Sequence, residues 1–98
     1  MHHDSLVITL AIGECQIRRV LVDTGSSVNV LTLKPLQRMG VDETTIVPTT
    51  LVLSGFSGKI QRPLGEVTLV TEAKGVKLST TYTMVDFLSP YNAIVGGP

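Results

Sequence analysis

Asp23 stands at the one place in this sequence best suited to acid–base chemistry. It follows the apolar run 20–22, Val-Leu-Val, and precedes the segment 24–27, Thr-Gly-Ser-Ser. The aliphatic and β-branched run predicts a strand that carries the carboxylate to the floor of a site, and Gly25 lets backbone or ligand come close to it. The same residues also fit an Asx turn, in which Asp23 caps its own loop. The motif alone leaves both interpretations open.

The composition indicates one globular domain, residues 1–98. Apolar residues make up 43% and charged residues 16% of the chain, too few charges for a disordered protein. The eight basic and eight acidic residues cancel. This balance excludes electrostatic attraction to nucleic acid or to an anionic membrane surface.

Few residues are suited to hold a metal ion or form a disulfide. Cys15 is the only cysteine, so the chain forms no internal disulfide, which fits a reducing compartment. His2 and His3 lack cysteine or acidic partners at ligand spacing, so we expect no metal there. No apolar run reaches membrane-spanning length and no signal peptide precedes the first strand, so we expect a cytoplasmic protein or a fragment cut from a larger chain.

Short apolar segments separated by turn signals predict an all-β domain around Asp23. The expected strands are residues 5–12, 15–22, 28–31, 48–53, 66–72, 76–85 and 91–98. One short helix is expected within 33–40, because Pro35 suits its first turn and Gly40 the position after its end. Gly65 is expected to mark a break or bulge. Such a pattern is typical of a small barrel or sandwich.

Strand periodicity also predicts which side chains share a face. In the segment 76–85, a period of two places four residues on one side, namely Leu78, Thr80, Tyr82 and Met84. Arg18 and Arg19 are expected at an exposed edge or end of the second strand.

Two further segments extend the pattern around Asp23. The segment 55–58, Gly-Phe-Ser-Gly, is a glycine-flanked aromatic tip, and the segment 94–96, Ile-Val-Gly, ends 71 residues after Gly25. In this order and spacing the three segments resemble the retropepsin family, the homodimeric aspartic proteases of retroviruses and LTR retrotransposons. The amino-acid sequence around Asp23 and near the end of the chain is most similar to the protease region of gypsy-type retrotransposon polyproteins. The resemblance covers residues 5–97.

The resemblance implies a small closed barrel with one short helix, assembled as a C2 homodimer. Asp23 would be half of a catalytic dyad, and Asp23 of a second chain would be the other half, since the sequence holds no second Asp-Thr-Gly. Two carboxylates about 3 Å apart share one proton, because both cannot ionise together. The charged carboxylate would act as base on a water molecule, and the protonated one would donate to the scissile carbonyl.

The resemblance also assigns roles to the residues that follow Asp23. Thr24 would hydrogen-bond across the two-fold axis and lock the paired loops. Gly25 would let the substrate backbone approach the dyad. The hydroxyl of Ser26 would donate to the carboxylate of Asp23 and favour its charged form.

The two distant segments receive roles by the same resemblance. The flap that closes over a substrate would be made of Gly55, Phe56, Ser57 and Gly58. The packing beneath the Asp23 loop would come from Ile94, Val95 and Gly96. Read without the resemblance, Phe56 is a hairpin tip packed on its own strand, and the segment 94–96 is a core strand ending in a turn.

The sequence departs from many retroviral relatives at two positions that brace the active-site loop. Those relatives pair an acidic residue with an arginine there, whereas this chain has Ser27 and Gly97, so the ion pair cannot form. Relatives also continue into a helix and a terminal strand that interdigitates with its partner, whereas this sequence stops at Pro98. We therefore expect a weak dimer that gains activity when the chain is extended.

Together these features predict an aspartic endopeptidase that cleaves extended peptides and processes its own retrotransposon polyprotein. This interpretation implies no organic cofactor. Its partners would be a second copy of itself and a peptide or polyprotein substrate, with no nucleic acid or membrane. Its location would be the cytoplasm, including virus-like particles. The alternative is a non-catalytic retropepsin-like module for dimerisation or peptide binding, and a third interpretation is a plain β domain with an Asx turn at Asp23. Oligomeric state and inhibition by a pepstatin-type compound discriminate among them.

Overall fold

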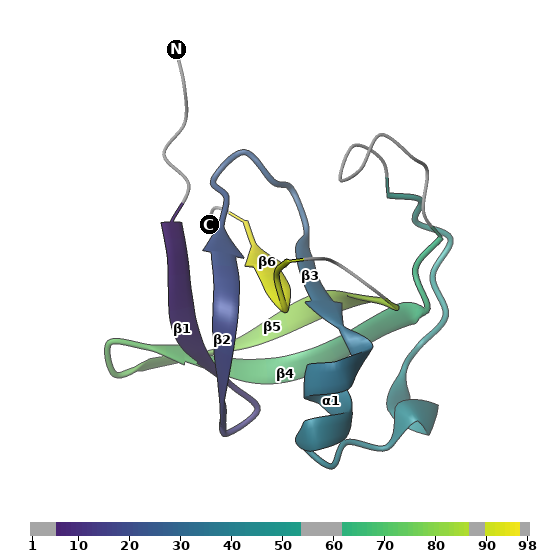
Figure 1. Cartoon of the computed structure of the whole chain (residues 1–98). Coiled ribbons are helices and arrows are strands. Elements are labelled where there is room, and N and C mark those ends of the chain that lie inside the picture. The colour runs from purple at the N-terminus through teal and green to yellow at the C-terminus, as the bar shows by residue number, and fades with distance from the viewer. Residues whose placement is uncertain (1–5, 54–61, 87–89, 97–98) are drawn as a thin grey trace.

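The chain folds into a six-stranded barrel, and the computed structural model describes residues 6–53, 62–86 and 90–96 of it. In chain order the elements are β1 (Leu6–Ile12), β2 (Cys15–Val22), β3 (Asn29–Thr32), α1 (Leu33–Arg38), the 3-10 helix η1 (Glu43–Thr45), β4 (Gly65–Ala73), β5 (Val76–Val85) and β6 (Ala93–Val95). The barrel closes in the order β1-β2-β6-β3-β5-β4 (Figure 1). The predicted all-β barrel with one short helix is confirmed, and the two-fold dimer stays a prediction.

Strands β1 and β2 form an antiparallel hairpin with an irregular register. Ile8 pairs with Val20, but Leu10 pairs with Ile17, so β2 has one residue more than β1 across this interval. The extra residue makes a β-bulge, and Arg19 within it adopts a positive φ of 55°. The bulge bends β2 on its way to Asp23.

Strand β6 is short, but it lies between the two strands on either side of the Asp23 loop (Figure 1). It runs parallel to β2, with Val22 opposite Val95, and antiparallel to β3, with Val30 opposite Ile94. The predicted strand 91–98 is therefore confined in the described residues to Ala93–Val95. This arrangement brings the end of β6 against the loop that carries Asp23.

The helix α1 ends as the sequence predicts. Gly40 has a φ of 75°, its N–H donates to the carbonyl of Gln37, and the N–H of Val41 donates to the carbonyl of Leu36. These two bonds form a Schellman motif, for which glycine is the favoured residue. The motif turns the chain back after Leu36 has entered the barrel core.

The strand predicted at 48–53 is wrong. This segment has no regular strand, and an isolated bridge joins the preceding Val47 to Glu66 of β4, with backbone bonds of 2.8 and 2.7 Å. Pro48 lacks the N–H that would continue such a ladder. Gly65 is not a break either, because it begins β4 with a φ of 147°, and a side chain there would collide with the carbonyl of Val47.

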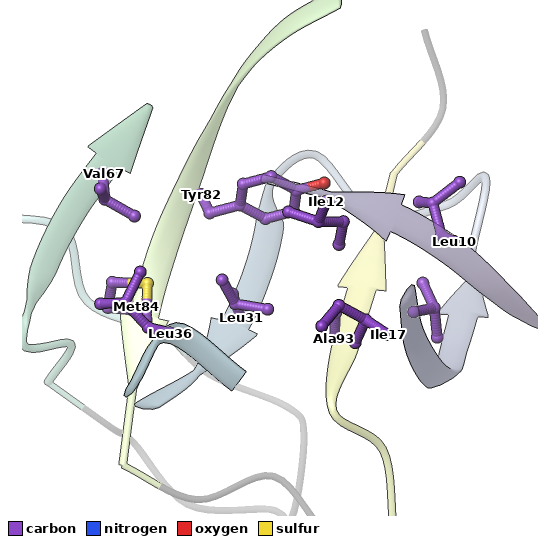
Figure 2. Close-up of a cluster of buried hydrophobic side chains, with 10 residues drawn as sticks. Leu10, Ile12, Ile17, Leu31, Leu36, Val67, Tyr82, Met84 and Ala93 are labelled. Atoms are coloured by element: carbon purple, nitrogen blue, oxygen red, sulfur yellow. The ribbon is translucent and has the colours of Figure 1, made fainter. Parts of the chain in front are cut away.

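Apolar side chains form two clusters on opposite sides of the strands that surround β6. The barrel core consists of Leu10, Ile12, Ile17, Val20, Leu31, Leu36, Val67, Tyr82, Met84 and Ala93 (Figure 2). The second cluster consists of Val30, Leu53, Val85 and Ile94, with Leu21, Val28, Leu51 and Tyr91 packed against it.

The predicted shared face of β5 is only partly right. Tyr82 and Met84 are fully buried in the core, whereas Leu78 is 63% exposed. The reason is that β5 pairs with β3 only from Tyr82 to Val85, so its first half extends beyond that partner. Among the described residues, no helix is long and apolar enough to cross a membrane.

Candidate active site

Asp23 is the first residue after β2, and β6 fixes its backbone. Its N–H donates to the carbonyl of Val95 over 2.9 Å. Because this bond continues the ladder between β2 and β6, the alternation of β2 extends to Asp23, whose side chain shares a face with Leu21. Leu21 belongs to the second cluster, so the carboxylate, which is half-buried, stands beside an apolar surface.

The loop after Asp23 closes on the carboxylate itself. The N–H of Gly25 donates to Asp23 Oδ1 over 3.0 Å, and the N–H of Ser26 donates to the Asp23 backbone carbonyl over 3.0 Å. The Asx turn considered from the sequence is therefore present. A carboxylate offers about four acceptor sites, and the turn bond from Gly25 fixes the orientation of Oδ1.

Gly25 keeps the space beside the carboxylate open. A methyl group at Gly25 would lie 3.4 Å from Asp23 Oδ1. Thr24 and Gly25 are both exposed. The roles predicted for them, a bond across a two-fold axis and access for the substrate backbone, stay predictions.

The bond predicted from Ser26 to Asp23 is wrong in this structure. The hydroxyl of Ser26 donates to the backbone carbonyl of Val28 over 2.8 Å, and its oxygen lies 3.4 Å from the Val28 N–H. A hydroxyl has one proton to donate, and here that proton shapes the loop. Serine side chains commonly make such local bonds to backbone two residues on, and these bonds compete with longer-range ones.

The end of β6 packs against the same loop. Gly96 lies so close to Ser26 that a Cβ at this position would collide with the Ser26 carbonyl oxygen. Ile94 is buried in the second cluster, and Val95 packs against the barrel core. The structure thus brings the segment 94–96 together with the segment 23–26, whereas the segment 55–58 lies outside the described residues.

Two asparagines that the sequence did not single out hold β6 at its two ends. Asn29 Oδ1 accepts a bond of 2.8 Å from the N–H of Gly96. At the other end, Asn92 Nδ2 donates to the carbonyl of Arg18 over 2.7 Å, and its N–H donates to the carbonyl of Arg19. Each asparagine is the second residue of a predicted strand, 28–31 or 91–98, and that position near a strand end was the signal available in the sequence.

The perturbed titrating groups lie away from Asp23. Burial raises the pKa of Tyr82, and the hydrogen bond of 2.6 Å to Thr71 opposes that rise in part. The N–H of Thr44 holds the pKa of the exposed Asp42 below its usual value at the start of η1. Within residues 6–53, 62–86 and 90–96, no group of three or more His, Cys, Asp or Glu side chains could hold a metal ion.

No family model and no curated protein matches the sequence significantly. Solved structures do match. The retroviral protease-like domain of Ddi1 from Leishmania major matches with a TM-score of 0.67 at 12% identity, covering 96% of this chain and 70% of that one. The EIAV protease complexed with the inhibitor HBY-793 matches with a TM-score of 0.68 at 19% identity, over 95% and 82% of the two chains.

A retropepsin-like aspartic protease from Rickettsia conorii matches with a TM-score of 0.65 at 20% identity, covering 94% of this chain and 65% of that one. All three are described as retroviral-protease-like or as proteases, and they share the small closed barrel. At these identities the likeness shows the fold, which is of the retropepsin type.

Proposed function

We propose that the chain is an aspartic endopeptidase that works as a homodimer, with one Asp23 from each copy. The observation that carries this proposal is the placement of Asp23. It lies in an Asx turn at the end of β2, tied to β6, in a barrel of retropepsin type. A carboxylate whose orientation is fixed by the surrounding backbone supports a role in proton transfer, because such a step depends on how the reacting groups are oriented.

The proposed reaction needs two carboxylates and one shared proton. The charged carboxylate takes a proton from water as the water oxygen attacks the carbonyl carbon of the peptide, and the protonated carboxylate donates to the carbonyl oxygen. The carboxyl group that took the proton from water then donates it to the amide nitrogen, and the carbon–nitrogen bond breaks as the carbonyl re-forms and returns its proton to the other carboxylate. A single chain offers one Asp-Thr-Gly, so a second copy must supply the other carboxylate across a two-fold axis.

The proposed substrate is an extended peptide that lies along the second cluster. Leu21 and Val28 bracket the Asp23 loop in the chain, and both pack against this cluster. An apolar wall suits the side chains of an extended strand, which gains affinity from main-chain bonds and specificity from side-chain pockets. We place the chain, by the resemblance of its motifs, in a gypsy-type retrotransposon polyprotein that it processes itself in the cytoplasm, including virus-like particles.

The decisive experiment compares Asp23→Asn with a matched Asp86→Asn control. Asp86 is exposed and follows Val85, which pairs with Thr32 at the end of β3 away from the Asp23 loop. Cleavage of unfolded casein and of a peptide library is followed by new N-termini. We expect wild type and Asp86→Asn to cleave and to be inhibited by pepstatin, and Asp23→Asn to be inactive with an unchanged circular dichroism spectrum. Cleavage by Asp23→Asn near the wild-type rate would refute the proposal.

A dilution series tests the homodimer. Because each half-site is inert alone, activity per milligram falls on dilution once monomer dominates. Constant specific activity down to concentrations at which sedimentation shows only monomer would exclude a shared dyad.

A second candidate function is favoured by the match to the Ddi1 domain, which is described as protease-like and belongs to a larger protein. In that case the barrel would dimerise or bind peptides without cleaving them. Binding of pepstatin or of library peptides by wild-type protein that produces no new N-termini would support this candidate over the endopeptidase.

A further inference from the structure

The side chain of Asn29 supplies a hydrogen bond at the point where the ladder of β6 ends. Strand β3 pairs with β6 at Val30–Ile94 and Leu31–Ala93, and the parallel pairing with β2 ends at Val95. The N–H of Gly96 lies one residue beyond these pairs. Asn29 Oδ1 accepts a hydrogen bond from this N–H over 2.8 Å. A side-chain carbonyl therefore takes the place of the next backbone acceptor in the ladder.

The bond from Asn29 controls a residue that touches the Asp23 loop directly. Gly96 abuts the carbonyl of Ser26, and the adjacent Val95 accepts from the N–H of Asp23. A shift at Gly96 therefore reaches the loop on both sides of the carboxylate. Asn29 is half-buried and follows the loop in the chain, so one residue joins the far end of the loop to the end of β6.

We propose that Asn29 is a positioning residue for Asp23, acting through Gly96. The role as a positioner of a catalytic group rests on the proposed function, whereas the mechanical link between Asn29, Gly96 and the loop does not. This link takes the place of the ion pair that Ser27 and Gly97 cannot form. A small displacement of a catalytic group costs rate more than binding, because the ground-state complex tolerates a geometry that the transition state does not.

Two substitutions at Asn29 distinguish the role of its side-chain oxygen as a hydrogen-bond acceptor from the role of its side-chain volume. Asn29→Leu keeps a similar volume without an acceptor, and the adjoining cavity of about 340 Å³, which Asn29 and Gly96 both line, leaves room for it. Asn29→Asp keeps an oxygen where Oδ1 stands. The matched control is Asn92→Leu, which removes the one hydrogen bond that the side-chain amide donates to the Arg18 carbonyl at the opposite end of β6.

The first readout is hydrogen exchange at the amides of Gly96 and Asp23. In Asn29→Leu we expect both amides to exchange about 10-fold faster, the loss of roughly one hydrogen bond, and in Asn29→Asp to exchange as in wild type. Asn92→Leu is expected to leave the relative protection of these two amides unchanged, even where it lowers the melting temperature. Unchanged exchange at Gly96 and Asp23 in Asn29→Leu would overturn the proposal.

The second readout is the separate effect of each substitution on kcat and on KM. Both are measured at each variant's pH optimum, with the concentration of active sites determined by titration with pepstatin. For Asn29→Leu we expect kcat to fall about 10- to 100-fold with KM nearly unchanged, and for Asn29→Asp we expect recovery of kcat. A loss of activity that merely follows the folded fraction, as in Asn92→Leu, would show a structural role only. If wild type cleaves nothing, the proposed function fails, and the exchange data still decide whether Asn29 positions the loop.

Discussion

The two faces of the sheet around β6 are both apolar, but they are closed in different ways. Successive residues of β3 alternate between them, since Leu31 enters the barrel core and Val30 the second cluster. The same holds on β6 for Ala93 and Ile94. Strands closing around the barrel cover the core, whereas the second cluster is covered by residues outside regular strands, such as Leu51 and Tyr91.

This difference shows how one short sheet serves both folding and the site. A face closed by hydrogen-bonded strands is fixed when the barrel forms. A face covered by connecting segments is more adaptable, because loops tolerate movement that packed strands do not. Asp23 stands on the second face, beside Leu21, so the adaptable side is the one where a peptide would bind.

The largest effect is expected from truncating one matched side chain on each face. Leu31→Ala should lower the free energy of unfolding by about 2–5 kcal/mol, because its fully buried side chain leaves a cavity that the barrel cannot fill. For Ile94→Ala we expect a decrease in the free energy of unfolding of about the lower end of that range, because the covering segment can collapse into the space left by the side chain. Urea unfolding measures both changes.

The same pair separates folding from binding. Per folded molecule, Leu31→Ala should cleave peptides as wild type does, whereas Ile94→Ala should raise KM because the segment that covers the second cluster shifts when Ile94 is truncated. If both variants changed KM equally, the two faces would not differ in function.

The sequence predicts well where structure depends on neighbouring residues. The apolar run before Asp23, the turn at 13–14 and the glycine after α1 all signal their conformations within a few residues, and each is present. The order of the Asp23, 55–58 and 94–96 segments also pointed to the fold that the solved structures share. Local propensity and motif order were sufficient there.

The sequence fails where the partner lies far along the chain. Nothing near Asn29 indicates that its side chain bonds Gly96, 67 residues away. The apolar content of 48–53 suggested a strand, but the backbone pairing involves the preceding Val47, which pairs with Glu66. Val47 lies so close to Gly65 that a side chain at Gly65 would collide with it. The hydroxyl of Ser26 had two acceptors within reach, and only the structure shows that the Val28 carbonyl takes the bond.

Tyr82→Phe tests how a polar group is accommodated on the core face, where the Tyr82 hydroxyl forms a hydrogen bond with Thr71. Burial raises the pKa of Tyr82, so the folded state holds this proton more tightly than the unfolded chain. The protonated Tyr82 therefore stabilises the folded state. This contribution to the free energy of unfolding is complete below the pKa of tyrosine in the unfolded chain, about 10, and is lost as pH rises through the folded-state pKa. The variant should lose about 1 kcal/mol at neutral pH through its hydrogen bond, and its stability should decline less above pH ~10.

Urea unfolding between neutral and alkaline pH tests this expectation, with Tyr91→Phe as the control. Tyr91 packs on the second cluster and is only half-buried. An equal alkaline decline in Tyr82→Phe and wild type would mean that ionisation of Tyr82 does not oppose folding.

The smallest effect is expected from Ser26→Ala, in the loop that borders the second face. Its hydroxyl proton goes to the carbonyl of Val28, so the variant should lose about 0.5 kcal/mol of stability through this half-exposed bond. The acidic limb of the pH–rate profile should stay where it is in wild type, because no proton of Ser26 reaches the Asp23 carboxylate in this structure. A shift of that limb to higher pH would show that the hydroxyl turns to Asp23 when two copies and a peptide assemble. The loop would then be as adaptable as the face it borders, and the positioning by Asn29 and Gly96 would have to operate on the assembled dimer.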